Sequence, residues 1–227
     1  MASPPDLQRM LAIDTSSRRA CVGLFDEKGT LSCKTSEEDA SLSLFPLIKH
    51  LLKEFKWQLS DINSIAFCKG PGSMLGIRTA IMGIRTWQGV KLIEGKQIYS
   101  FSSLAIGAEL VRHSSPSEKT YLVITDARRN SWNALKVKEL SIGPVQFIDN
   151  ATLEAENIPL FSFNEFPKWT RTQAHIQYLS YLPENVLSSP RFPLFLEKNS
   201  DANHIDLRSI EFAKWIPTAR TADRIKS

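Results

Sequence analysis

Short apolar runs separated by polar turns open the chain. Met10–Asp14, Ala20–Phe25 and Thr30–Lys34 each have the length and the apolar content of a strand, and turn residues such as Asp26 and Gly29 stand between the last two. Connections this short join antiparallel neighbours. The pattern therefore predicts a three-stranded antiparallel meander at the start of the fold.

The apolar residues next recur with a helical period. Between Ser41 and Lys56 they fall in an arc of about 160°, which is wider than contact with a single sheet requires, and Pro46 should begin or bend this helix. The remaining elements of this half are predicted as a strand at Ser64–Cys68, a helix at Ser73–Lys91, a strand at Gln97–Tyr99 and a helix at Ser102–Val111. The predicted order is βββαβαβα.

The opening pattern then returns about 110 residues later. Tyr121–Arg129 is an apolar run that ends in Asp and is followed by two arginines, as is Leu11–Arg19. A chain that repeats its own opening is typical of two lobes of related topology. We therefore predict an N-terminal lobe over residues 1–115, a smaller C-terminal lobe over 116–200 and a tail over 201–227.

The pattern in the second half is weaker. Trp132–Val137 and Pro144–Ile148 are strand candidates that would complete a second meander. Further along, a helix is predicted over Trp169–Tyr181 and a strand over Leu194–Leu196. We expect this lobe to be partly irregular.

Two predicted helices carry more apolar or small residues than one sheet face needs. Gly76, Thr79, Ala80 and Gly83 share an arc of about 100°, and a glycine inside a helix costs about 0.5–1 kcal/mol unless close backbone approach recovers it. Either the chain's own sheet and helices pack there, or another subunit does. The residues predicted for a partner interface are Leu44, Phe45, Ile48, Leu52, Gly72, Ser73, Gly76, Arg78, Thr79, Ala80 and Gly83.

The glycine turn has a second possible role, as a phosphate site. Backbone N–H groups at Gly72 and Ser73 would lie at a helix N-terminus, and Asp14, Thr15 and Ser16 could serve magnesium and phosphate. These five residues form a candidate vestigial nucleotide site. The turn lacks the lysine and the spacing of a P-loop, and the chain has no Gly-Gly dipeptide for an adenosine turn. No catalytic residue is therefore assigned.

Composition narrows the class of protein further. The 227 residues are 42% hydrophobic, have a net charge of +4, and contain no apolar run long enough to cross a bilayer. We expect a soluble cytoplasmic protein with no membrane partner. Cys21, Cys33 and Cys68 match no redox or zinc spacing and are expected to be reduced thiols packed in strands. The four histidines, His50, His113, His175 and His204, stand too far apart to predict a metal site.

The order and spacing of several stretches resemble the TsaB (YeaZ) family. The stretches that carry this resemblance are Leu11–Ser16, Leu44–Ile48, Asp61–Ala66, Gly70–Arg78, Ser102–Leu104, Asp126–Arg128 and, more weakly, Pro193–Leu196. The glycine motif is the most specific of them. The match departs from the family pattern at Met74 and Leu75, where relatives often have Phe and Thr, and at Ala40-Ser41, where many have His-Ser.

The resemblance implies an α/β fold of the actin/sugar-kinase type (ASKHA), with two ribonuclease-H-like lobes that each open with a three-strand meander and add helices. It also implies a non-catalytic subunit that pairs, through a helical bundle, with a related TsaD-type catalytic subunit. With a TsaE-type ATPase and ATP, that subunit transfers threonylcarbamoyl to N6 of adenosine 37 in tRNAs that read ANN codons. The helices at Ser41–Lys56 and Ser73–Lys91 would then supply half of the bundle.

Under this resemblance no cofactor is expected on the isolated subunit, and ATP and magnesium belong to the complex. Two alternatives stay open: an ATP-dependent small-molecule kinase of the same fold, and a homodimer with no tRNA role. Contact with tRNA would come through the complex. The candidates for that contact are the basic tail residues Lys214, Arg220, Arg224 and Lys226.

Overall fold

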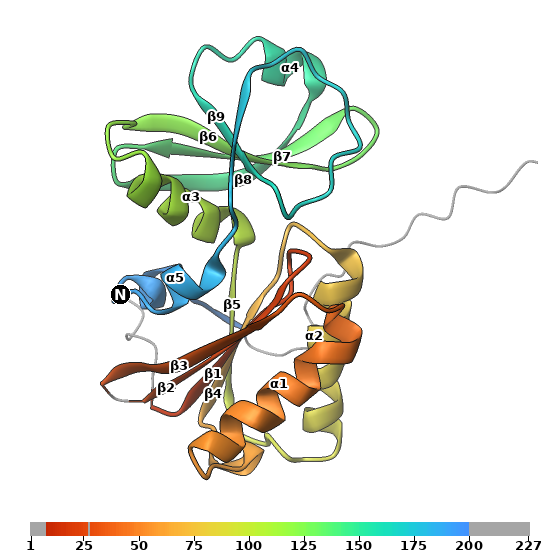
Figure 1. The fold of residues 1–227 in the computed structure, drawn as a ribbon, viewed down its shortest axis with the longest axis vertical. Coiled ribbons are helices and arrows are strands. Elements are labelled where there is room, and N and C mark those ends of the chain that lie inside the picture. The colour runs from red at the N-terminus through yellow and green to blue at the C-terminus, as the bar shows by residue number, and fades with distance from the viewer. Residues whose placement is uncertain (1–7, 27, 200–227) are drawn as a thin grey trace, which may run out of the picture.

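Two β-sheets, one in each of two lobes, form the framework of the computed structural model, which describes residues 8–26 and 28–199 (Figure 1). The first sheet has the order β11-β5-β4-β1-β2-β3. Its first five strands along the chain are β1 (Met10–Asp14), β2 (Ala20–Asp26), β3 (Gly29–Ser36), β4 (Ser64–Cys68) and β5 (Gln97–Phe101). The strands β1, β2 and β3 pair antiparallel, whereas β1, β4 and β5 are parallel. The predicted meander is confirmed.

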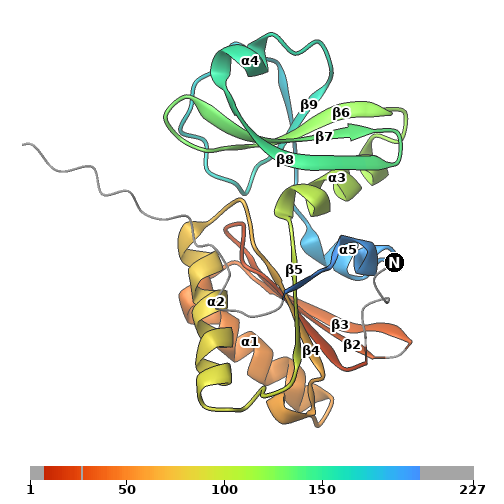
Figure 2. The same ribbon diagram turned by 180° about the vertical axis from the view of Figure 1, so that it is seen from behind.

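Helices cover both faces of the first sheet. α1 (Ala40–Glu54) and α2 (Met74–Gly89) lie side by side on one face, and α5 (Pro183–Leu187) contacts β2 and β3 on the other. α3 (Ser103–Ser114) lies between the lobes and packs on the second sheet (Figures 1 and 2). Successive side chains of strand β1 point to opposite faces of the sheet, and all five of its residues are buried, so β1 is covered on both faces. Leu11 and Ile13 pack under α1 and α2, and Met10 and Ala12 join the core between the lobes.

The second sheet repeats the strand order of the first. Its strands are β6 (Thr120–Asp126), β7 (Ser131–Lys138), β8 (Ser141–Asp149), β9 (Leu160–Phe163) and β10 (Ile176–Leu179), in the order β10-β9-β6-β7-β8. In both sheets the first three strands pair antiparallel, the fourth pairs parallel with the first, and the fifth pairs parallel with the fourth. This is the ribonuclease-H-like arrangement, and two copies of it make the predicted actin/sugar-kinase-type fold, which is confirmed. A short helix, α4 (Asn150–Glu154), packs on the outer side.

Two predictions in the second half are wrong. The segment predicted as a helix, Trp169–Tyr181, holds a loop and strand β10. The amides of Trp169 and Thr170 donate to the carboxylate of Asp126, and the Thr170 hydroxyl donates to it at 3.0 Å. Because these two amides bond to Asp126, the segment is held as a loop and does not begin a helix here. The strand predicted at Leu194–Leu196 is instead a 3₁₀ turn, η2 (Phe192–Phe195).

The last described segment returns to the first lobe. Helix α5 (Pro183–Leu187) packs on β2, β3 and α3, and strand β11 (Glu197–Asn199) pairs antiparallel with β5. The sheet order thus assigns β11 to the first sheet, although the chain division given above places it in the second lobe. The boundary near residue 116 stays a prediction. Residues 201–227, with the four basic tail candidates and His204, lie outside the described residues.

A further 3₁₀ turn, η1 (Leu59–Asp61), leads from α1 into β4. Over the part of the chain that the structure describes, no helix combines the length and the apolar character needed to span a membrane. The three cysteines lie in β2, β3 and β4 as free thiols, which confirms the expectation for them.

Candidate functional site

Asp14, at the end of β1, is fully buried and fully engaged by the chain itself. Its Oδ1 accepts hydrogen bonds from the Ser16 amide at 2.9 Å and the Ser16 hydroxyl at 2.7 Å. Its Oδ2 accepts one from the Tyr181 hydroxyl at 2.8 Å, and Tyr181 is itself fully buried. Burial raises the pKa of Asp14 above its ordinary value of 3.8. Tyr181 therefore closes off the carboxylate that would have to face magnesium or phosphate.

The glycine turn packs directly on the β1–β2 turn. The Ser73 amide donates to the Ser16 carbonyl at 2.6 Å, and the Ser73 hydroxyl caps α2 by accepting from the Gly76 amide at 3.2 Å. A Cβ at Gly76 would lie 2.1 Å from the Thr15 carbonyl oxygen, so only glycine allows this approach. The structure brings the five candidate phosphate-site residues together. Asp14, Ser16 and Ser73 are engaged by hydrogen bonds within the chain, whereas the Thr15 hydroxyl is buried with no hydrogen-bond partner in the described part of the chain.

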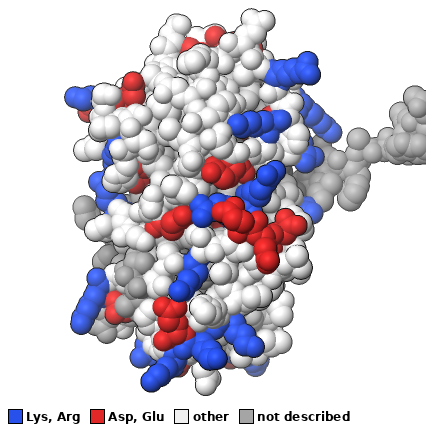
Figure 3. Space-filling model, viewed as in Figure 1, with Lys and Arg blue, Asp and Glu red and all other residues white. Residues whose placement is uncertain are grey.

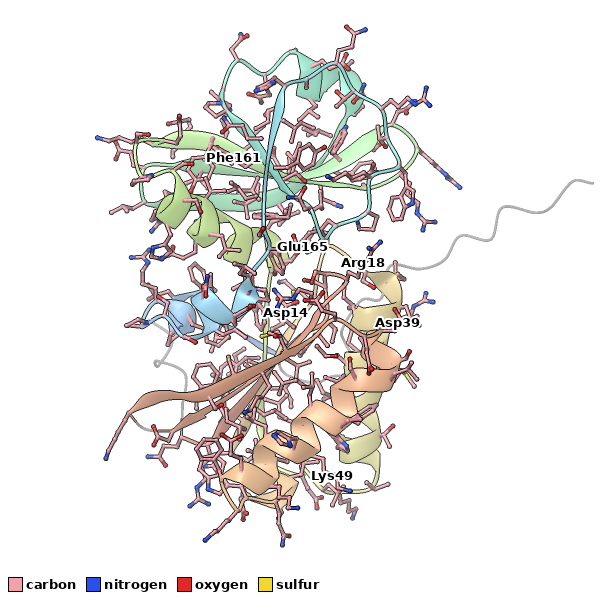
Figure 4. The ribbon with its side chains drawn as sticks, in the orientation of Figure 1. Asp14, Arg18, Asp39, Lys49, Phe161 and Glu165 are labelled. Atoms are coloured by element: carbon pink, nitrogen blue, oxygen red, sulfur yellow. The ribbon has the colours of Figure 1, made fainter. Side chains whose placement is uncertain are left out.

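A cleft of about 430 Å³ lies where the two lobes meet. Arg18, Asp39 and Ser73 line it from the first lobe, and Glu165 and Lys168 line it from the second. Figure 4 shows Asp14, Arg18 and Glu165 where the lobes meet. The lining carries both signs of charge, and Asp14 is not part of it. Within residues 8–26 and 28–199, no group of three or more His, Cys, Asp or Glu side chains could hold a metal ion.

A backbone hydrogen bond joins the two lobes beside this cleft. The Arg18 amide donates to the Glu165 carbonyl at 3.3 Å, and the Glu165 carboxylate accepts from the Tyr181 amide at 2.7 Å. Arg19 pairs at 3.3 Å with Glu184 of the segment 183–187, which packs on β2 and β3 of the first sheet. The carboxylates of Glu165 and Glu184 therefore hold the chain's own segments in place.

An exposed apolar surface runs across α1 and α2. We call it the α1–α2 face, and it consists of Leu42, Phe45, Leu75, Thr79, Met82 and Thr86. Leu42 is 68% exposed, Leu75 62% and Met82 53%, which is unusual for side chains of this size. Spacings of four, three and four residues place the four α2 members on one side of the helix.

The two threonines add to the apolar character of this face. The Thr79 hydroxyl donates to the Leu75 carbonyl at 3.0 Å, one turn back along α2. The Thr86 hydroxyl donates in the same way to the Met82 carbonyl at 2.8 Å. Because each hydroxyl is satisfied within the helix, a partner would meet methyl groups. Contiguous exposed apolar surface of this kind marks protein interaction sites.

Comparisons with known proteins agree with this architecture. The family model described as TsaD, tRNA N6-adenosine threonylcarbamoyltransferase, matches residues 33–158, more than half of the chain. A TsaB biosynthesis protein of Buchnera aphidicola (subsp. Schizaphis graminum) is 36% identical over 101 residues, which are 44% of this chain and 47% of that protein. The TsaB of Escherichia coli K12 is 33% identical over 86 residues, 37% of this chain and 36% of that one. The chain belongs to the TsaB/YeaZ family.

A solved structure shows the same fold. YeaZ from Pseudomonas aeruginosa superposes with a TM-score of 0.60 at 21% identity, over 87% of this chain and 97% of that one. The matched segments span about half or less of the length of the curated TsaB relatives. The curated relatives confirm the sequence resemblance to the TsaB/YeaZ family.

The structure separates the predicted interface residues of this TsaB/YeaZ-family chain into two groups. Buried in the chain's own core or against its own elements are Leu44, Ile48, Leu52, Gly76, Ala80 and Gly83. A Cβ at Gly83 would lie 2.8 Å from the Phe45 ring of α1, so this glycine serves contact between α1 and α2. The chain's own packing covers these six residues, and their predicted role at an interface stays a prediction.

The other predicted residues reach the surface. Phe45 is exposed, and Gly72, Ser73, Arg78 and Thr79 are partly so. Their role at an interface stays a prediction. Sequence reasoning missed Leu42, Met82 and Thr86 of the α1–α2 face, although their helical spacing relative to Phe45 and Thr79 was a usable signal. Leu75, one of the departures from the family pattern, lies on this face as well.

Proposed function

We propose that this chain is a non-catalytic subunit that pairs with a related TsaD-type catalytic subunit in the biosynthesis of tRNA threonylcarbamoyladenosine. The catalytic subunit transfers threonylcarbamoyl to N6 of adenosine 37 in tRNAs reading ANN codons. A TsaE-type ATPase and tRNA join through the complex, in the cytoplasm. ATP and magnesium act in the complex, and the isolated chain carries no cofactor of its own. The names of its relatives support the pathway.

The single observation that carries the pairing role is the α1–α2 face. It presents large apolar side chains and bonded threonines on two adjacent helices, and a second helix pair laid against it would complete a four-helix bundle. A related subunit would carry an equivalent helix pair. Burial of Leu42, Leu75 and Met82 would then supply the core of the interface.

The non-catalytic role is supported by the state of Asp14. An enzyme of this fold that uses ATP would need this first-strand carboxylate to face the nucleotide, whereas here Tyr181 and Ser16 occupy both of its oxygens. Titration calorimetry of the isolated chain with ATP and magnesium is expected to show no binding heat. Tight binding would favour the kinase alternative instead.

The pairing role is tested with Met82→Glu. Glutamate is a good helix former, and Met82 is half exposed, so the denaturation midpoint should stay close to that of the wild type. A charge on the apolar face should weaken the mixed complex with a TsaD-type subunit by about tenfold or more, measured by multi-angle light scattering over a dilution series. The matched control is Leu140→Glu, which changes an apolar residue of the second lobe that is even more exposed than Met82.

Each outcome separates the proposal from its alternatives. Wild type and Leu140→Glu should form the mixed complex at the same concentration. If wild type forms only homodimers in the presence of the TsaD-type subunit, the homodimer alternative is correct and the pairing role is refuted. If Met82→Glu pairs as well as Leu140→Glu, the subunits use a different surface.

A further inference from the structure

A groove of about 870 Å³ lies at the end of α1, beside the α1–α2 face. Its apolar floor includes Phe45, Leu52, Trp57 and Trp87, contributed by α1, the segment that follows it and α2. Phe45 is 40% exposed and belongs to both surfaces. The groove therefore extends the apolar surface along α1.

Lysines line one side of this groove. Lys49, Lys53 and Lys56 are exposed; Lys49 and Lys53 are four residues apart on one side of α1, and Lys56 lies just beyond the end of the helix. Within residues 8–26 and 28–199, none of these three ammonium groups forms an ion pair, whereas the neighbouring carboxylate of Glu54 pairs with Lys34 at 3.0 Å. Figure 3 shows Lys and Arg gathered at the lower end of the molecule, where α1 ends in Figure 1, and Figure 4 shows Lys49 on α1. The groove thus combines an apolar floor with three unpaired positive charges and no carboxylate in its lining.

The aromatic rings of the groove already have partners within the chain. The guanidinium of Arg9 lies 5.2 Å from the centre of the Trp57 ring, and the Phe45 and Trp87 rings meet edge to face with centroids 6.0 Å apart. Single-stranded nucleic acid binds such sites by stacking bases on open ring faces. A ligand with apolar side chains and carboxylates fits the observed groove better than an RNA strand does.

Two of the lysines match the repeat of a helix. Lys49 and Lys53 are separated by roughly 6 Å along α1, and Lys56 follows beyond the end of the helix. Carboxylates four residues apart on a second helix repeat at the same distance and would lie opposite the ammonium groups of Lys49 and Lys53, while Lys56 adds a third positive charge at the helix end. A helix with an apolar ridge between such carboxylates would also fill the floor around Phe45, Trp57 and Trp87.

We propose that this groove binds an acidic amphipathic helix of the pairing partner, and that Lys49, Lys53 and Lys56 select it by charge. The inference rests on the pairing role proposed above, since it names the chemistry of the partner segment. Its charged part acts mainly on recognition and on the rate of association, because exposed ion pairs are weak and are screened by salt.

The test uses labelled probes and fluorescence anisotropy with the full chain. One probe is a helical peptide with a Leu/Trp ridge flanked by glutamates, the second has lysines in place of those glutamates, and the third is a single-stranded RNA oligonucleotide. The groove variant combines Lys49→Glu, Lys53→Glu and Lys56→Glu. A control variant makes the same change in charge at exposed lysines elsewhere, Lys119, Lys138 and Lys198.

The acidic peptide is expected to bind wild type about tenfold more tightly than the basic peptide at low salt, with the difference shrinking as salt is added. The groove variant should lose about tenfold in affinity for the acidic peptide and the control variant less than about twofold. Equal binding of both peptides, equal losses in both variants, or groove-dependent binding of RNA alone would each overturn the proposal. Because no TsaD-type subunit is present, failure here leaves the pairing role standing, and failure of the mixed complex leaves this result unaffected.

Discussion

The close backbone approach at the start of α2 gives a quantitative prediction about Gly76→Ala. A Cβ at this position would lie 2.1 Å from the Thr15 carbonyl oxygen, and such contacts are normally no shorter than about 3 Å. The neighbouring atom is backbone, so α2 and the β1–β2 turn must separate by about 1 Å. Overpacking of this kind costs about 1–3 kcal/mol.

A second contribution comes from the hydrogen bond that holds the same two segments together. The Ser73 amide donates to the Ser16 carbonyl at 2.6 Å, and weakening it adds about 1 kcal/mol. Alanine returns about 0.5–1 kcal/mol through its higher helix propensity. The net loss in the free energy of unfolding is about 2 kcal/mol. In a chain of this length that lowers the melting temperature by roughly 4–8 °C.

The same helix supplies the matched control, Gly89→Ala. Nothing lies within 4 Å of a Cβ at Gly89, near the end of α2, so this substitution should be neutral or slightly stabilising. Urea denaturation followed by circular dichroism compares the two variants with wild type. Equal midpoints for Gly76→Ala and Gly89→Ala would refute the reasoning, because the two positions would then offer the same space.

Two further predictions follow from buried titratable groups. Burial raises the pKa of Asp14 in the folded state above 3.8, so the stability that Asp14 contributes is full below that pH and is lost as pH rises through the raised pKa. The free energy of unfolding of Asp14→Asn should therefore increase relative to that of wild type over this rise in pH. A difference between the two proteins that is the same at every pH would contradict this. Among the thiols, a hydrogen bond with Cys21 lowers the pKa of Cys33, whereas burial raises the pKa of Cys68. Titration of the native protein with a thiol reagent should therefore modify Cys33 first, and labelling that persists in Cys33→Ser would contradict this.

The first lobe could be predicted because its local signals agree with its packing. Met10–Asp14 reads as a strand, and it is one, buried on both faces. The second lobe gave fewer such signals. There the loop at Trp169 and Thr170 is fixed by Asp126, a residue more than forty positions earlier, and no local periodicity records that contact. The same limit applies to Tyr181, whose bond to Asp14 joins the two ends of the fold.

The glycine stripe shows why the candidate site was harder to predict than the fold. Small residues allow close approach whether the neighbour is the same chain or another one, so the pattern at Gly76 and Gly83 could not decide between them. In the structure both neighbours belong to the same chain. Gly76 allows α2 to pack closely on the β1–β2 turn, and Gly83 allows the Phe45 ring to lie against α2. That second contact has a consequence for the surface. Phe45 is held at the junction of the α1–α2 face and the lysine-lined groove, so the internal glycine packing sets the shape that a partner would meet.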